Sequence, residues 1–262
     1  IRPPQLKQKA SFQKLAFCLW GKMLALIMVK FRLQKSDEAL TESILRKAGE
    51  HQQKHPLFAR LGFEKIYKFL SNEEKIFIKK IMGIDPQNYG FRGLRYALVP
   101  VPQKLVVIRN QQYRQKGGLK TLPPQLVPKK VYSAFRKLNE AMEKDISKKL
   151  LIESAYRSPA YQLITFLHYL KFHKWDLRRT VKRVALPGYS EHGFPPKQAF
   201  DFITIDGIPA DEKPLEFAKT KEYKWLLRNA KKFNFHLSYP RNNKWGITFE
   251  PWHWAFGERK SY

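Results

Sequence analysis

The carboxyl-terminal part of the chain places a carboxylate and an imidazole three residues apart, among large apolar rings. Within the stretch TFEPWHWAF, Glu250 precedes His253, and one tryptophan lies on each side of the histidine. The residue before a proline favours extended backbone, so we expect Glu250 to end a strand over residues 245–250 and Pro251 to open a helical turn. Such a turn brings both groups to one side, and the tryptophans would cover them.

Two residues further upstream turn this pair into a candidate metal site. His192 lies in the loop LPGYSEHG, and Asp201 lies in the apolar stretch AFDFITI. Side chains alternate along a strand, so Asp201 shares a face with isoleucines, where a carboxylate is costly unless a cation compensates for it. His192, Asp201 and His253 form an N, O, N donor set that suits a catalytic zinc ion. The alternative for Asp201 is a buried carboxylate satisfied by hydrogen bonds.

Hydrolysis is the chemistry that this set of residues favours. Zinc lowers the pKa of a bound water toward ~7, which makes hydroxide available at neutral pH. Glu250 can take a proton from that water and return it to a leaving amine. Arg157, directly after the stretch LLIESAY, can hold a carbonyl oxygen as it becomes anionic. An ion pair with Glu153 or Glu191 is the alternative for this arginine.

The elements that must position these residues alternate between strand and helix. Apolar residues at helical spacing, a Ser158-Pro159 helix start and alternating strand patterns define them. The mixed order indicates an α+β domain over residues 131–262. Strands are predicted over 150–156, 199–205 and 245–250, and helices over 131–148, 158–172 and 214–233.

A basic, mostly helical region is predicted before this domain, over residues 36–130. Ser71 and Glu74 have the spacing of a capping box, and Gly83 suits the end of the helix that follows. The part after Gly83 is less regular, with turns predicted at its Gly-Gly and Pro-Pro pairs. Helices are predicted over 36–54 and 57–70, and a strand over 105–108.

Residues 1–35 are predicted to contain a signal or anchor segment. The apolar stretch 15–31 follows several basic residues, as in a signal peptide or signal anchor. Lys22 interrupts the stretch, so an amphipathic helix on the domain surface is the alternative. Export or anchoring would place the protein in the periplasm or cell envelope.

The charge of the chain favours polyanionic surroundings. The 262 residues include 50 Lys and Arg against 22 Asp and Glu, a net charge of +28. Anionic lipid, acidic envelope polymers and nucleic acid all suit such a surplus. No nucleic-acid reader motif accompanies it, so we expect no nucleic-acid partner. The single cysteine, Cys18, excludes an intramolecular disulfide and a cysteine-based zinc cage.

Three ordered motifs resemble a known family. SAYRSPAYQ, LPGYSEHG followed by AFDF, and EPWHW are similar to motifs of the zinc D-alanyl-D-alanine carboxypeptidases of the VanY type. The resemblance covers roughly residues 131–258. It implies a small antiparallel sheet with flanking helices, the fold shared with the hedgehog signalling domain. The residues to which it assigns roles are zinc ligands His192, Asp201 and His253, catalytic base Glu250, and carbonyl partner Arg157.

The same resemblance implies a substrate groove lined by Ser190, Tyr156 and Gln162, with Ser190 near the terminal carboxylate. One spacing departs from the family pattern, which has the aspartate seven residues after the histidine. Asp201 follows His192 by nine residues, so the loop between the two is longer here.

We therefore expect a monomeric zinc peptidase that trims peptidoglycan stem peptides, with removal of the last D-alanine as the leading reaction. An L,D-carboxypeptidase or an endopeptidase of the same fold is the first alternative. A non-catalytic protein that binds the cell envelope is the second, although such a protein needs neither Glu250 nor Arg157.

Overall fold

The computed structural model describes residues 33–102, 104–208 and 211–257. Lys35–Tyr262 form one compact unit, and the predicted boundary at residue 130 falls inside it. The apolar stretch 15–31 lies outside the described residues. Among the residues that are described, none of the helices combines the length and the apolar character needed to cross a membrane.

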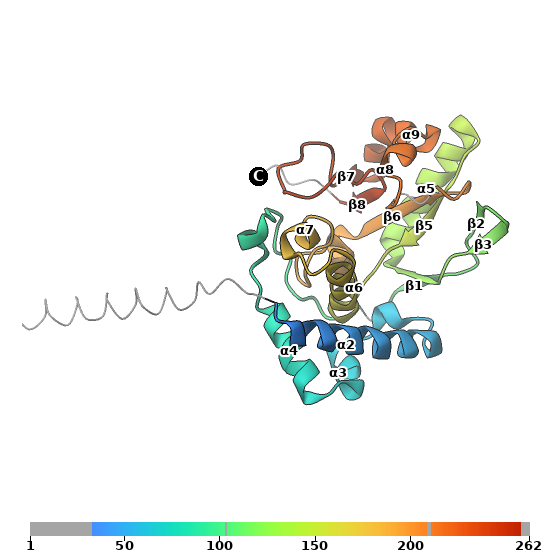
Figure 1. Ribbon diagram of the computed structural model, residues 1–262. Helices are drawn as coiled ribbons and strands as arrows, with labels where there is room; N and C mark the ends of the chain where they lie inside the picture. Colours follow the sequence, from blue (N-terminus) through green and yellow to red (C-terminus); the bar gives the residue numbers. More distant parts are fainter. Residues whose placement is uncertain (1–32, 103, 209–210, 258–262) are drawn as a thin grey trace, which may run out of the picture. The chain divides into compact units, whose positions relative to one another are not determined.

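A four-stranded antiparallel sheet forms the centre of the site-bearing half of this unit (Figure 1). Its strand order is β5-β6-β8-β7, so β6 and β8 lie in the middle. The predicted α+β fold with a small antiparallel sheet and flanking helices is confirmed. The bounds are Leu150–Ser154 for β5, Ala199–Thr204 for β6, Phe235–Leu237 for β7 and His253–Phe256 for β8.

The two faces of the sheet have different surroundings because side chains alternate along its strands. Phe200 and Phe202 of β6 lie on the face that packs in the main hydrophobic core, together with side chains of α5 and α9. Asp201, between them, lies on the opposite face and is paired in register with His253 of β8. The helices on the core face are α5 (Lys129–Ile146), α8 (Pro214–Phe217) and α9 (Lys221–Asn229).

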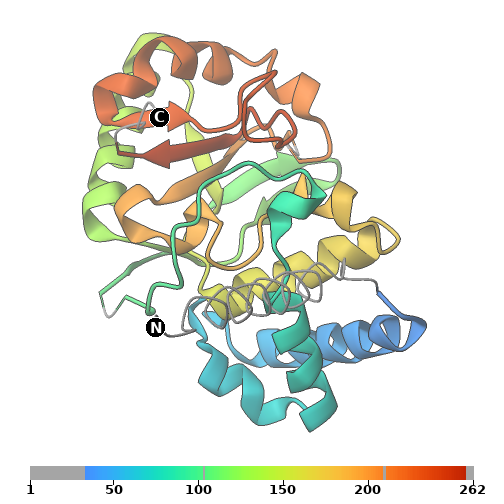
Figure 2. The same ribbon diagram turned by 90° about the vertical axis from the view of Figure 1, so that its left-hand side faces the viewer.

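Helix α6 (Pro159–Phe172) lies between the sheet and the amino-terminal helices (Figure 2). Ser158 caps it, as predicted, because its Oγ accepts a hydrogen bond of 3.1 Å from the Tyr161 backbone N–H. Pro159 at the first position costs no hydrogen bond there. A short helix, α7 (Leu177–Val181), follows α6.

Three helices of the amino-terminal region pack together near α6: α2 (Lys35–Lys54), α3 (Phe63–Ile66) and α4 (Asn72–Met82). The predicted capping box at Ser71 and Glu74 is present, and α4 ends at Gly83. Glu74 also accepts hydrogen bonds of 2.9 and 2.8 Å from Lys47 of α2. The buried carboxylate of Glu74 therefore takes part in the amino-terminal cap of α4 and also connects α4 to α2 through Lys47.

Two small hairpins connect this helical region to α5. Strand β1 (Val106–Ile108), which was predicted, pairs with β4 (Gln125–Val127). The hairpin of β2 (Gln112–Gln115) and β3 (Gly118–Thr121) was not predicted as such. Its turn has positive φ angles at two consecutive glycines, which such tight turns favour.

Three predicted elements differ from the structure. The helix over 57–70 is wrong, since α3 there has only four residues, with short 3-10 turns on either side. The helix over 214–233 is divided, because the Thr220 side chain caps a new helix, α9. The strand over 245–250 is also wrong. Glu250 donates its backbone N–H to the Tyr239 carbonyl in a loop, and the strand begins at His253.

Candidate metal centre

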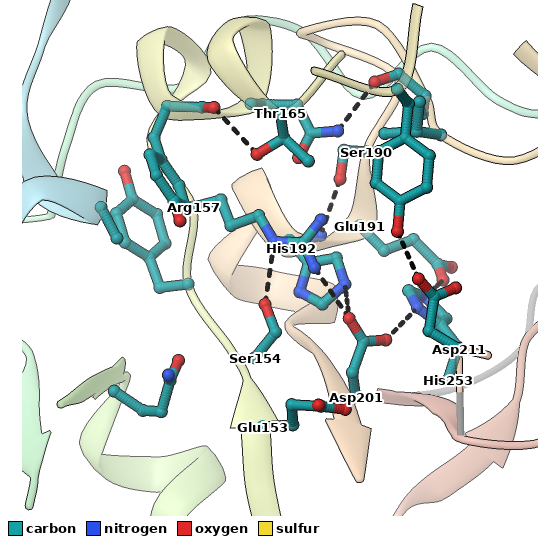
Figure 3. A pocket seen from close by; sticks show the side chains of 18 of the residues that line it. Glu153, Ser154, Arg157, Thr165, Ser190, Glu191, His192, Asp201, Asp211 and His253 are labelled. Carbon is teal, nitrogen blue, oxygen red and sulfur yellow. Dashed lines mark hydrogen bonds and ion pairs between the residues drawn. The ribbon is translucent and has the colours of Figure 1, made fainter. Parts of the chain in front are cut away.

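Three elements bring the predicted metal ligands together. His192 lies in a 3-10 turn (Glu191–Gly193), Asp201 on β6, and His253 at the start of β8. One donor atom of each lies within 4.8 Å of the others, and all three residues are buried. Figure 3 shows the three side chains pointing toward one another. The β6–β8 register brings two of the three ligands together, since Asp201 and His253 are direct neighbours across the sheet.

The protonated nitrogen of His192 is fixed by the backbone. Its Nδ1 lies 2.7 Å from the carbonyl oxygen of Ala155, which can only accept a hydrogen bond. Nδ1 therefore holds the proton, and Nε2 is directed at Asp201, 3.2 Å from Oδ2. Burial, assisted by the nearby Arg157 guanidinium, lowers the pKa of His192 to about 4. The ring is neutral at pH 7, as a metal ligand must be.

His253 lies between two carboxylates, and one of them was not predicted as part of the site. Its Nδ1 lies 2.9 Å from Asp201, and its Nε2 lies 3.0 Å from Oε2 of Glu191. Tyr96 donates its hydroxyl to the other oxygen of Glu191, at 3.1 Å. Glu191 therefore holds a proton on Nε2 and leaves Nδ1 as the metal-binding nitrogen. Apart from its place beside His192, nothing in the sequence marks Glu191.

The charges around His253 change its pKa strongly. Burial disfavours the imidazolium, but hydrogen bonds to Asp201 and Glu191 outweigh burial and raise the pKa of His253 to about 10. Burial likewise opposes the charge of Asp201, yet the two histidines hold its pKa well below the usual value. Without a metal, the protonated His253 supplies the positive charge that this buried carboxylate requires.

Arg157 pairs with Asp201 rather than with Glu153 or Glu191. Its Nη2 lies 2.8 Å from Oδ2 of Asp201, and its Nε donates to Ser154 Oγ at 2.9 Å. These two contacts hold the guanidinium at the edge of the donor set. A fixed positive donor in that place suits an oxygen that becomes anionic.

Glu250 lies beside the donor set, as predicted, and a turn at residues 251–252 brings it to the same side as His253. Its Oε2 is 3.9 Å from His253 Nδ1, and its Oε1 is 4.0 Å from Arg183. Burial raises the pKa of Glu250 to about 7, and the nearby positive charges of His253 and Arg183 offset burial only in part. Such a carboxyl group can accept and release a proton near neutral pH. Arg183, which also pairs with Asp211, was not predicted.

The rings around His253 are not the expected ones. Among the described residues, the ring centroids of Tyr239 and His192 both lie 4.9 Å from that of His253. Trp252 lines the cleft. Trp254 is paired with Phe200 in register and therefore belongs to the core face of the sheet. Trp252 precedes β8, in the turn that follows Glu250, so its side chain is not placed by the register of that strand.

The donor set lies in a cleft of about 360 Å³. All three predicted substrate residues, Tyr156, Gln162 and Ser190, line this cleft. Gln162 donates its Nε2 to the Ala185 carbonyl at 2.7 Å. Among the described residues, its Oε1 and the Tyr156 hydroxyl have no hydrogen-bond partner, although both are buried. Since buried polar groups are rarely left unpaired, these two atoms are suited to a ligand.

The amino-terminal region forms one wall of the same cleft, which was not predicted. Its cleft-lining residues lie in the last turn of α2 and in the segment between α2 and α3. Phe58 packs edge-on against Tyr161 of α6 with ring centroids 5.8 Å apart. Ser158 fastens this wall to α6, since its backbone N–H and hydroxyl donate to the carbonyls of Ala59 and Leu61, at 2.8 and 2.6 Å. The lining residues of this wall are Gln52, Pro56, Phe58 and Ala59.

The donor set fits zinc. Its members are two imidazoles and one carboxylate, which are buried and point toward a common centre. Three protein ligands of this kind leave a fourth zinc coordination position open. The second ring nitrogen of each histidine donates a hydrogen bond, from His192 to the Ala155 carbonyl and from His253 to Glu191. Such hydrogen bonds orient imidazoles that bind a metal.

Comparison with known proteins agrees with the resemblance found in the motifs. Residues 124–259 match the model of the family described as VanY, D-alanyl-D-alanine carboxypeptidase. YodJ of Bacillus subtilis (strain 168), which carries the name of a carboxypeptidase, is 26% identical over 179 residues. That alignment covers 61% of this chain and 62% of YodJ, so the chain spans less than two thirds of this relative.

Two solved structures are also similar. One is a variant of the vancomycin-resistance D,D-pentapeptidase VanY in complex with Zn(II), with 20% identity, a TM-score of 0.45, and coverage of 64% of this chain and 88% of that chain. The other is the LD-carboxypeptidase LdcB, with 23% identity, a TM-score of 0.46, and coverage of 65% and 77%. The family match extends over more than half of the 262 residues, and the chain therefore belongs to the VanY family of D-alanyl-D-alanine carboxypeptidases.

Proposed function

We propose that this protein is a zinc-dependent D,D-carboxypeptidase that releases the terminal D-alanine from peptidoglycan stem peptides. The observation that supports this most is the convergence of His192, Asp201 and His253 within 4.8 Å. A buried carboxyl group with a pKa of about 7, Glu250, lies next to them. Family membership supports a peptidoglycan carboxypeptidase, and the donor set supports zinc as its metal.

In this proposal the zinc ion would be held by His192 Nε2, an oxygen of Asp201 and His253 Nδ1. When bound, zinc would polarise the scissile carbonyl and lower the pKa of a water molecule. Glu250 takes a proton from the attacking water onto a carboxylate oxygen, and then donates it to the amine nitrogen of the leaving D-alanine. Both proton transfers need a group with a pKa near neutrality, which burial gives to Glu250.

The remaining cleft residues bind and orient the peptide. Arg157 donates to the scissile carbonyl oxygen and stabilises its negative charge. The Tyr156 hydroxyl and Ser190 can donate hydrogen bonds to the terminal carboxylate. Gln162 contributes an acceptor, because its amide nitrogen is already bound to Ala185, so its Oε1 suits a peptide N–H.

The proposal is tested with zinc-loaded protein and stem peptides of four and five residues, with product masses as the readout. The wild-type protein is expected to remove one alanine from the five-residue peptide. Glu250→Gln should keep its zinc content and lose about 10²–10⁴-fold in kcat, the usual contribution of general acid–base catalysis. Full activity of this variant would exclude Glu250 as the base.

The same experiment separates the alternatives of the same fold. Release of alanine only from the four-residue peptide would indicate an L,D-carboxypeptidase, and cleavage of cross-linked dimers would indicate an endopeptidase. If zinc-loaded protein cleaves none of these substrates, a non-catalytic envelope-binding protein is the better description.

We also propose that the protein acts in the periplasm or cell envelope, because its proposed substrate lies there. Fractionation of cells that produce the full chain tests this, with the chain expected in the envelope fraction. Recovery solely with cytoplasmic markers would contradict it.

A further inference from the structure

An irregularity in β5 directs an additional carboxylate into the cleft. Ile152 is paired with Phe202 and Ser154 with Asp201, so Glu153 is an extra residue with no partner in β6. In a regular strand, consecutive side chains point to opposite faces. A β-bulge changes this locally and re-aims a side chain. As a result, both Glu153 and Ser154 line the cleft.

The two side chains at the bulge have different contacts. Ser154 Oγ accepts a hydrogen bond from Arg157. Within the described part of the chain, Glu153 makes no hydrogen bond or ion pair, although it is partly buried. Burial and the nearby Asp201 carboxylate raise the pKa of Glu153 to about 7, and Arg157 offsets them only in part. Leaving a carboxylate partly desolvated in this way is costly unless a cation compensates for it.

The position of Glu153 indicates which half of the substrate can supply that cation. Figure 3 shows Glu153 next to Asp201, on the side away from Ser190 and Thr165. Under the proposed function, the terminal carboxylate of the leaving amino acid lies toward Ser190, and a second carboxylate near Glu153 would be repelled. The acyl half of the peptide therefore extends past Glu153.

We propose that Glu153 binds a side-chain ammonium in the acyl half of the substrate, and so selects stem peptides that contain a residue with a free side-chain amine. This inference rests on the proposed function and names its substrate class. Lysine reaches the carboxylate with a flexible four-carbon stem and forms a charge-assisted hydrogen bond there. An acylated amine lacks the charge and is disfavoured.

The test uses two synthetic five-residue stem peptides that differ only at the third residue, lysine or Nε-acetyl-lysine. For zinc-loaded wild-type protein at low ionic strength, kcat/KM should be at least tenfold higher for the free amine. Glu153→Gln should reduce this ratio to about twofold or less while activity on the acetylated peptide and zinc content stay unchanged. Glu153→Asp should keep part of the preference. The matched control is Asp206→Asn, since Asp206 pairs with Lys148 outside the cleft.

Binding of the two product peptides, measured by calorimetry, gives a readout that does not need turnover. Equal binding and equal kcat/KM for the two wild-type reactions would overturn the role of Glu153, while D-alanine release would still support the proposed function. Equal losses on both peptides in Glu153→Gln would also overturn it. If neither peptide is cleaved, the proposed reaction fails, and preferential binding of the free-amine peptide alone would still support the ammonium site.

Discussion

At the scale of single residues, Asp201 is the centre of the site. Its carboxylate faces nitrogen atoms of Arg157, His192 and His253 at 2.8 to 3.2 Å. The two histidines have opposite protonation preferences, since the pKa of His192 falls to about 4 and that of His253 rises to about 10. The metal-free protein therefore holds a proton on Nδ1 of His253 at neutral pH, and under the proposed function a zinc ion would displace it.

We expect zinc binding to release this proton. Below the raised pKa of His253, each increase of one pH unit should strengthen zinc affinity about tenfold, because metal and proton compete for Nδ1. Calorimetry at pH 7 in buffers with different ionisation enthalpies measures the release directly. Heats that do not depend on the buffer would contradict the assigned protonation state.

The same pKa shift predicts how pH affects the metal-free fold. A histidine with a raised folded-state pKa stabilises the fold fully below its unfolded pKa of 6.5, and this contribution is lost as the pH rises through about 10. The free energy of unfolding of metal-free protein should therefore decrease between pH 7 and 10. His253→Gln should show a weaker decrease over this range.

At the scale of elements, the start of α6 connects the cleft walls. Ser158, the residue after Arg157, caps α6 and also donates its hydroxyl to the Leu61 carbonyl. Local signals predicted this helix start and the capping box of α4, because each depends on residues within three positions of one another. Glu191 and the Phe58 wall were missed because their contacts join distant segments. The hydrogen bond that His253 donates to Glu191 spans 62 residues.

Ser158→Ala should destabilise the fold by about 2 kcal/mol, since it removes a helix cap and takes the hydroxyl partner from the partly buried Leu61 carbonyl. It should also lower kcat/KM, because the hydroxyl bond to the Leu61 carbonyl is lost and only the backbone bond to Ala59 still fastens this wall beside Arg157. Denaturant unfolding and peptide kinetics measure the two effects. Thr220→Ala removes the cap of α9, outside the cleft, and should affect stability alone.

Alternating apolar residues did not suffice to place the last strand. WGITFE has the pattern of a strand, but its backbone bonds to loops, with Thr248 donating to Lys182 and Glu250 donating to Tyr239. Those partners lie in other segments of the chain, and no local pattern in the sequence predicts them. The metal donor set could still be predicted, because that prediction depends on the imidazole and carboxylate side chains and not on where the last strand begins.

At the scale of the whole molecule, the positive charge is concentrated on particular segments. Residues 213–244 contain nine Lys and Arg against two Asp and Glu. They include α9, whose Lys224 and Arg228 are exposed one helical turn apart. Such a surface suits the anionic lipids and polymers of the proposed envelope location.

We expect the protein to bind anionic lipid vesicles but not neutral ones, with binding lost at high salt, because salt screens exposed charges beyond about 10 Å at 0.1 M. Charge reversal at Lys224 and Arg228 should weaken vesicle binding and leave cleavage of soluble peptides unchanged. Vesicle sedimentation at two salt concentrations measures this. Equal binding to neutral vesicles would contradict an electrostatic origin.

The extra residue in β5 also has an evolutionary consequence. Loss of the single codon for Glu153 would restore an unbroken ladder opposite β6, where Asp201 lies. Under the proposed role of Glu153, relatives would gain or lose tolerance for amine-blocked cell-wall peptides by a change in length, with the metal donor set and Glu250 retained. An alignment that treats such a one-residue gap as neutral would overlook a change in substrate specificity.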